Sequence, residues 1–283
     1  MTSQILISRL HLTTGVHMSI GRQVRLKQLF SNPSGNLFGV AIDHFVTYGQ
    51  AVEGGLAHLP TALAKLIEGN PDTVTMTGGT AKHLWLEHVN KARLIVEAAS
   101  FTPDDRVSEL LFEPLDAVQL GADALAVAIP VRGPSEGKYL HWLTNSVRAS
   151  HKYEMPIVAH IYPRDYSDGV KIVFTPEEIA WAVRCGIETG VDVIKVGYVG
   201  DPVAFKEIVD NCPVPIVIAG GPKEPTLLDA LTSTQAAIQA GAKGAVVGRN
   251  VWGADDPKKA AKAYYGVINE NLSPAEALSK AGL

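Results

Sequence analysis

Short apolar runs recur along the chain, each followed by a small or polar loop and then by a stretch with helical periodicity. The runs are rich in valine and isoleucine, the composition expected of parallel strands that are buried on both faces. Their spacing of roughly 25–35 residues matches one strand–helix unit. Eight such runs stand at residues 36–42, 72–76, 93–99, 122–129, 155–161, 191–197, 214–220 and 243–248.

The stretches between the runs carry helix start and stop signals. Residues 57–68 place apolar side chains at i, i+3 and i+4 spacing, as an amphipathic helix does. Thr175 begins a capping box with proline at the first helical position, which predicts a helix starting at Pro176. Gly121, Gly190 and Gly241 precede apolar runs, where a left-handed helix end favours glycine.

Eight strands alternating with helices allow a closed barrel or an open doubly wound sheet. An open nucleotide-binding sheet would carry GxGxxG after its first strand, but the sequence there is Ala41-Ile42-Asp43-His44-Phe45. The number of runs and the length of 283 residues therefore favour a single (β/α)8 TIM barrel over residues 25–283. Residues 1–24 are expected to form an N-terminal arm lying on the barrel or on a neighbouring subunit.

Composition excludes several classes of protein. The chain is 46% hydrophobic and balances 25 basic against 29 acidic residues, which excludes a disordered chain and disfavours a nucleic-acid partner. No run approaches the ~20 apolar residues needed to cross a bilayer, so we expect no membrane partner. Cys185 and Cys212 form no CxxC pair, and no secretory signal is evident, which together favour a cytoplasmic protein.

In a TIM barrel the chemistry sits at the carboxyl ends of the strands. The sequence places polar residues at these ends, whereas Asp123 and Asp192 stand at strand starts and are expected to stabilise the opposite face. The strand-end residues are Asp43, His44, Thr77, Glu97, Arg132, His160, Tyr162, Lys195, Lys223, Arg249 and Asn250.

Lys195 is the unusual residue among them. It shares a strand face with Val191 and Val193, which predicts an ammonium group inside the barrel. Burial disfavours the charged form of lysine, and a neutral amine attacks carbonyl carbon to form a Schiff base. The alternative is a surface or salt-bridged lysine without a chemical role.

Four further side chains are candidates to act beside Lys195. Tyr162 and His160 point the same way from the strand before it, where a phenol could move protons during imine formation. Asp43 follows the first strand and could orient the lysine, although it could equally cap a helix or pair with Arg249. His44 and His160 are weaker candidates, because a lone histidine is usually a packed core or rim residue.

The loops after the seventh and eighth strands are glycine-rich. Glycines let backbone amides approach a phosphate closely, and barrels commonly bind phosphate with these two loops. Lys223 or Arg249 would supply the fixed positive charge. The sequence therefore predicts a phosphate site at Gly220, Gly221, Lys223, Gly248 and Arg249, against the alternative of two tight turns.

Metal and serine-nucleophile chemistry are not indicated. The nine histidines are scattered, HExxH and GxSxG are absent, and the pattern suggests no cluster of carboxylates with histidines at the strand ends. We expect no metal and no cofactor.

With Asp43, Tyr162-Pro163-Arg164, Lys195, and the segments 213–223 and 244–252 in view, the chain resembles the DhnA/FbaB branch of class I aldolases, within the DeoC/LacD superfamily. The resemblance implies an imine at Lys195, Tyr162 as proton shuttle and Asp43 as acid, base or electrostatic partner. It also implies phosphate binding by Gly220, Gly221, Gly248 and Arg249, and a homo-oligomer, since decamers occur in the family.

The chain departs from the family pattern at His160, where the fructose-bisphosphate aldolase branch tends to have tryptophan. A thiolase branch lacks the tyrosine that this chain has at Tyr162. Three functions stay open. The leading one is a metal-independent class I aldolase acting on a phosphorylated ketose-like carbonyl substrate. The others are a thiolase that moves an acyl group from a phosphorylated diketone to coenzyme A, and a non-catalytic barrel that binds a phosphorylated ligand.

Overall fold

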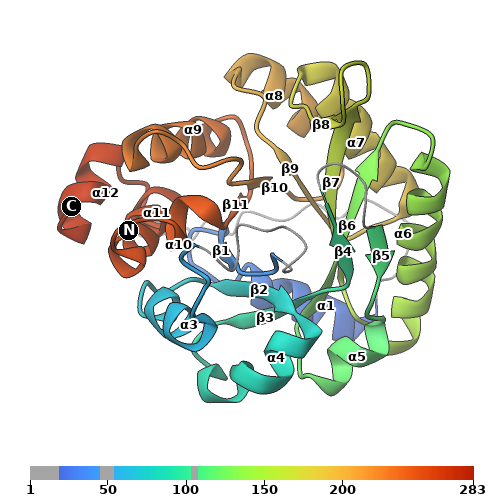
Figure 1. The fold of residues 1–283 in the computed structure, drawn as a ribbon, viewed down its shortest axis with the longest axis horizontal. Helices are drawn as coiled ribbons and strands as arrows, with labels where there is room; N and C mark the ends of the chain where they lie inside the picture. The colour runs from blue at the N-terminus through green and yellow to red at the C-terminus, as the bar shows by residue number, and fades with distance from the viewer. Residues whose placement is uncertain (1–18, 45–53, 103–107) are drawn as a thin grey trace, which may run out of the picture.

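Eight parallel strands close into a ring in the computed structural model, which describes residues 19–44, 54–102 and 108–283 (Figure 1). The ring order is β6-β3-β2-β1-β11-β10-β9-β7, and pairing of β6 with β7 closes it. Each strand overlaps one of the apolar runs, and β2, β6 and β7 extend beyond the end of theirs, so the predicted TIM barrel is confirmed. The strands are β1 (Leu37–Ala41), β2 (Thr73–Thr77), β3 (Arg93–Glu97), β6 (Ala124–Val131), β7 (Ile157–Asp165), β9 (Val193–Gly197), β10 (Ile216–Ala219) and β11 (Gly244–Val247).

Helices surround the strands on the outside of the ring (Figure 1). The predicted helix start and stop are confirmed for α7. The Thr175 side chain accepts a hydrogen bond from the amide of Glu178 at the start, and Gly190 ends the helix with a φ of 80°. The helices are α1 (Ile20–Leu29), α3 (Leu59–Ile67), α4 (Gly78–Leu84), α5 (Pro114–Gln119), α6 (Glu136–Ser150), α7 (Pro176–Thr189), α8 (Pro202–Asp210), α9 (Leu227–Gln239), α10 (Arg249–Trp252), α11 (Pro257–Asn269) and α12 (Pro274–Ala281), with 3-10 turns at Trp85–His88 and His151–Tyr153.

Two short β elements extend the carboxyl end of the barrel, and the sequence pattern did not predict them. Strands β4 (Ala99–Phe101) and β5 (Ser108–Leu110) form an antiparallel pair after β3. Strand β8 (Lys171–Ile172) pairs with the end of β7. The buried Arg164 of β7 donates a hydrogen bond of 2.8 Å to the carbonyl of Thr102, which fastens the end of β7 to the segment after β4.

The core has two layers, one inside the ring and one between strands and helices. Val193 lies in the inner layer, as predicted for the face that carries Lys195. Val191 packs in the outer layer instead, because it precedes β9 and does not follow the alternation of the strand. The inner layer holds small and medium side chains, namely Leu37, Ala41, Ile95, Ala124, Ala126, Val158, Val193, Val217 and Val246, together with Leu29 of α1.

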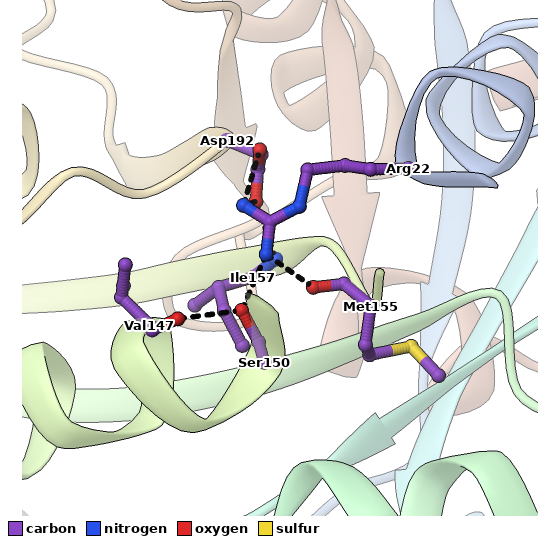
Figure 2. A network of polar contacts seen from close by, with 6 residues as sticks. All are labelled: Arg22, Val147, Ser150, Met155, Ile157 and Asp192. Atoms are coloured by element: carbon purple, nitrogen blue, oxygen red, sulfur yellow. Dashed lines mark hydrogen bonds and ion pairs between the residues drawn. The ribbon is translucent and has the colours of Figure 1, made fainter. Parts of the chain in front are cut away.

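Helix α1 is fastened to the amino-terminal end of the barrel (Figure 2). The guanidinium of Arg22 contacts both carboxylate oxygens of Asp192 at 3.2 Å, the hydroxyl of Ser150 and the carbonyl of Met155. Asp192 also accepts a hydrogen bond of 2.8 Å from the amide of Ile157, which fulfils its expected stabilising role at a strand start.

The expected boundary between residues 24 and 25 falls inside α1, which runs from Ile20 to Leu29. Residues 1–18 of the predicted arm lie outside the described residues. Within the described part of the chain, no helix is long and apolar enough to cross a membrane.

Candidate active site

An open cavity lies at the carboxyl ends of the strands, and the space inside it together with the solvent at its mouth amounts to about 760 Å³. Nine of the ten predicted site residues line it, so the fold brings together positions that are far apart in the sequence. These nine are Asp43, His44, His160, Tyr162, Lys195, Gly220, Gly221, Gly248 and Arg249. The tenth, Lys223, is not among the lining residues, and its ammonium group donates a hydrogen bond of 2.5 Å to the carbonyl of Gly253.

Lys195 is buried in β9, with 4% of its surface exposed, and lines the cavity wall. Burial lowers the pKa of its amine below the ordinary value, and the carboxylates of Asp43 and Glu97 oppose that shift. The environment therefore shifts the amine towards its uncharged form, which is the nucleophilic one.

His160 and Tyr162 of β7 stand beside Lys195. His160 pairs with Lys195 in the register of the two neighbouring parallel strands, so their side chains leave the sheet at the same level. Tyr162 lies two residues further along β7 on the same face and also lines the cavity. These positions agree with the alternation predicted from the sequence.

Glu97 at the end of β3 is a cavity residue to which the sequence analysis gave no role. Its Oε1 accepts hydrogen bonds from the amides of Ala99 at 2.8 Å and Ala128 at 3.1 Å. Burial raises the pKa of this carboxyl to about 7, while the backbone amides and Lys195 act in the opposite direction. An acid inside an otherwise apolar, inward-facing strand is the signal that could have identified it.

Glu97 reaches His160 across the intervening strand β6. Nδ1 of His160 lies 2.9 Å from Oε2 of Glu97 and 4.0 Å from Oδ2 of Asp43. Burial holds the pKa of His160 well below its ordinary value, and Lys195 adds to that shift, so the ring is neutral near pH 7. Nε2 of His160 is buried and makes no hydrogen bond within the described residues, whereas Oε2 of Glu97 has Nδ1 of His160 as its polar neighbour.

The expectation that no carboxylate–histidine cluster forms at the strand ends is wrong. Asp43, Glu97 and His160 each present one possible metal-binding atom, and these atoms lie within 4.8 Å of one another. Two amide hydrogen bonds already engage the other oxygen of Glu97, and the Lys195 side chain lines the same cavity. A distance of 2.9 Å between nitrogen and oxygen is typical of a direct polar contact, which leaves no space for an ion between the two atoms.

Asp43 and His44 form the wall that follows β1. Nδ1 of His44 lies 3.5 Å from Oδ1 of Asp43, and the His44 ring meets Trp252 edge-on with centroids 5.4 Å apart. Burial lowers the pKa of His44, Asp43 opposes this, and Arg249 and Lys195 reinforce it. A neutral His44 and a carboxylate therefore stand together at one side of the cavity.

The two glycine-rich loops are joined by side chains from α10. Arg249 donates a hydrogen bond of 2.9 Å to the carbonyl of Gly221. Asn250 donates to the carbonyls of Gly220 and Pro222 at 2.8 and 2.9 Å and accepts from the amide of Glu224 at 2.8 Å. The sequence placed Asn250 at a strand end without a role, and its role in the structure is to hold the seventh loop against the eighth.

A closed (β/α)8 barrel with a buried lysine, adjoining acids and a glycine-lined mouth defines the class of imine-forming barrel enzymes. The profile described as DeoC/LacD family aldolase matches residues 38–254, and the chain belongs to this family. It is accordingly a class I aldolase.

The relatives cover nearly the whole chain. An uncharacterized aldolase of Saccharolobus solfataricus is 30% identical over 274 residues, which is 92% of this chain and 98% of the relative. The 2-amino-4,5-dihydroxy-6-oxo-7-(phosphonooxy)heptanoate synthase of Streptomyces griseus is 29% identical over 267 residues, covering 92% and 95%. A Schiff base forming fructose-1,6-bisphosphate aldolase aligns with a TM-score of 0.76 and 28% identity, covering 87% and 99%.

Proposed function

We propose that this aldolase makes or cleaves a carbon–carbon bond next to a ketone in a phosphorylated, ketose-like substrate, through an imine at Lys195. The observation that carries the proposal is the buried amine of Lys195 in the wall of a cavity that also contains Tyr162 and Asp43. The sequence resemblance assigns the same three residues to this chemistry.

The reaction begins when the neutral amine of Lys195 adds to the carbonyl carbon. The resulting carbinolamine loses water after its oxygen receives a proton, for which the Tyr162 hydroxyl is the donor. The protonated imine then withdraws electrons from the neighbouring carbon–carbon bond and stabilises the carbanion that cleavage produces, while the hydroxyl on the departing carbon gives its proton to the Tyr162 phenolate and becomes the aldehyde carbonyl. The Asp43 carboxylate stabilises the positive charge that develops on the imine nitrogen.

Gly220, Gly221, Gly248 and Arg249 are assigned to the phosphate of the substrate. Arg249 carries a permanent positive charge at the cavity wall, and the glycine backbone admits close approach of an anion. The names of two relatives support this assignment, since one contains a phosphonooxy group and the other a bisphosphate. Binding energy from the phosphate would hold the carbonyl carbon in reach of Lys195.

Borohydride trapping tests the proposal. The wild-type chain, mixed with a panel of phosphorylated ketoses and sodium borohydride, should gain the mass of one reduced ketose fragment, and peptide mapping should place it on Lys195. Lys195→Ala should gain no mass, whereas Lys206→Ala, at an exposed lysine of α8, should label like wild type.

Two results would overturn the proposal. Labelling that persists in Lys195→Ala would show that the imine does not form on this residue. Turnover that EDTA abolishes would assign the chemistry to a metal ion.

A further inference from the structure

The segment that begins with β8 runs beside the end of β7 at the mouth of the cavity. Strand β8 is antiparallel to β7, with Ile172 opposite Arg164, and the amide of Val173 continues the pairing with a hydrogen bond of 3.0 Å to a carbonyl of β7. The same register, extended by two residues, places Phe174 opposite Tyr162. Residues directly opposite each other in an antiparallel pair project from the same face, so Ile172 and Phe174 point to the side that carries Tyr162.

Gly197 at the end of β9 makes room for the Phe174 ring. A β-carbon at Gly197 would lie 2.0 Å from Cδ1 of Phe174, so any other residue there would displace the ring. Gly197 lies two residues beyond Lys195 on β9, and the two positions therefore share the face that points into the barrel. The ring fills the place of this missing side chain, on the mouth side of Lys195. Both Ile172 and Phe174 line the cavity.

The proposed cleavage brings the departing aldehyde next to these two side chains. The hydroxyl on the departing carbon gives its proton to Tyr162, so that carbon lies within hydrogen-bonding reach of the phenol. The substituent on that carbon then meets Phe174, which stands opposite Tyr162, and Ile172 nearer the mouth. Both are hydrocarbon side chains, so they stabilise an apolar substituent and would leave a charged one without a polar partner.

The basic groups of the cavity already have other roles. Among the described residues that line it, the basic side chains other than histidine are Lys195 and Arg249. Burial lowers the pKa of His44 and of His160, which keeps both rings neutral near pH 7. Lys195 is bonded to the ketone fragment during the reaction, and Arg249 binds a carbonyl of the glycine-rich loops. An anionic group on the aldehyde would therefore meet Phe174 without a counter-charge from these residues.

Resting on the proposed imine at Lys195, we propose that Phe174 and Ile172 form the wall that binds the aldehyde fragment and that they select an aldehyde with an apolar substituent. The substrate class is then a phosphorylated ketose-like compound with its phosphate on the ketone fragment and a hydrocarbon group on the aldehyde fragment. Phe174 and Ile172 determine specificity in this proposal and take no part in proton transfer.

Two aldehydes with the same number of non-hydrogen atoms test the proposal. One is 4-methylpentanal, which ends in an isopropyl group, and the other is succinic semialdehyde, which ends in a carboxylate instead. Each is mixed with the enzyme and with dihydroxyacetone phosphate or hydroxyacetone phosphate as the ketone, and the adduct is measured by mass spectrometry. In wild type, kcat/KM for 4-methylpentanal should exceed that for succinic semialdehyde by at least about 10-fold. Comparing this ratio across variants cancels the intrinsic reactivity of the two aldehydes.

Four variants locate the preference on the wall. Phe174→Arg places a guanidinium beside the departing carbon and should lower the ratio by at least about 10-fold. Ile172→Lys adds a charge at a partly exposed position, where folding is not at risk, and should change the ratio in the same direction. Phe174→Leu keeps an apolar side chain and should keep the preference for 4-methylpentanal. Val203→Arg adds the same charge at a position of α8 that is 80% exposed and should keep the wild-type ratio.

Borohydride labelling separates this inference from the proposed function. If no phosphorylated ketose labels Lys195 in wild type, the imine proposal fails. If Lys195 is labelled but succinic semialdehyde reacts as fast as 4-methylpentanal, or neither aldehyde reacts, the imine proposal stands and the apolar aldehyde wall is overturned. The same conclusion follows if Phe174→Arg and Ile172→Lys both keep the wild-type ratio.

Discussion

Glu97 is buried at the carboxyl end of the barrel interior, beside the apolar inner layer and in contact with His160. Two backbone amides bind one of its oxygens, yet burial still raises the pKa to about 7. Desolvation therefore outweighs two hydrogen bonds and the attraction of Lys195. Near neutral pH this residue exists partly as an acid and partly as a carboxylate, so small changes in pH alter the charge beside Lys195.

Replacing this acid should change how stability depends on pH. Because the pKa of Glu97 in the folded chain is raised to about 7 from an ordinary value of 4.5, its favourable contribution is complete below pH 4.5 and is lost as pH rises through 7. The difference in the free energy of unfolding between Glu97→Gln and wild type should move in favour of the variant by up to about 3 kcal/mol between pH 4.5 and pH 8.

Denaturant unfolding at a series of pH values measures that difference. Glu207→Gln serves as the control and should track wild type throughout. A difference that stays constant from pH 4.5 to pH 8 would contradict the raised pKa of Glu97.

At the scale of the elements, the barrel strands were predictable because each is buried on both faces and therefore reads as a short apolar run. The helix ends were predictable because Thr175 and Gly190 act locally, through a cap and a positive φ. Strands β4, β5 and β8 were not, since they are two or three residues long and pair only where the barrel end brings them together.

The candidate site likewise contains residues that the sequence could predict and contacts that it could not. Lys195, His160 and Tyr162 follow from strand alternation, so the sequence locates them. The approach of Glu97 to His160 depends on small side chains of the strand between them, which no pattern within β3 encodes. The orientation of Lys223 depends on a carbonyl thirty residues away at Gly253, so sequence position alone assigned it to the cavity.

The two glycine-rich loops, to which we assign the substrate phosphate, depend on one buried amide side chain in α10, that of Asn250. Asn250→Ala removes hydrogen bonds to Gly220, Pro222 and Glu224 and leaves their backbone groups unpaired. We expect a loss of about 2–4 kcal/mol in the free energy of unfolding. The KM for a phosphorylated ketose should rise about 10-fold or more, while borohydride labelling of Lys195 at saturating ketose stays within about threefold of wild type.

Steady-state kinetics measures the change in KM, and thermal unfolding measures the loss in the free energy of unfolding. The exposed Asn211, whose side chain donates a hydrogen bond to the Glu207 carbonyl, supplies the control variant Asn211→Ala, with little expected change in either quantity. An unchanged KM in a destabilised Asn250→Ala chain would show that the loops do not bind the phosphate.

On the scale of the whole molecule, the barrel separates a reactive end from a stabilising end. The ion pair of Arg22 with Asp192 belongs to the stabilising end, where both side chains are almost fully buried. Burial raises the pKa of Asp192, and Arg22 counteracts that rise. Removing Arg22 would leave a buried carboxylate without its partner charge.

Arg22→Met should therefore cost about 3–5 kcal/mol of unfolding free energy near neutral pH. The cost should shrink as pH falls, because Asp192 without Arg22 has a higher pKa and becomes protonated. The double variant Arg22→Met/Asp192→Asn should recover part of the loss. The kcat of folded Arg22→Met, measured well below its melting temperature, should equal that of wild type, and a lowered kcat would show that this end also shapes the active site.

Helix α1 has one further consequence for turnover. Leu29 and the inner layer fill the barrel beneath Lys195, so in the described residues the cavity opens only towards the carboxyl ends of the strands. Under the proposed imine mechanism, the fragment bonded to Lys195 would lie deeper than the fragment that has been freed. Product release would then be ordered, with the unattached aldehyde departing before water hydrolyses the imine, and an accumulated aldehyde would compete with that hydrolysis by driving resynthesis.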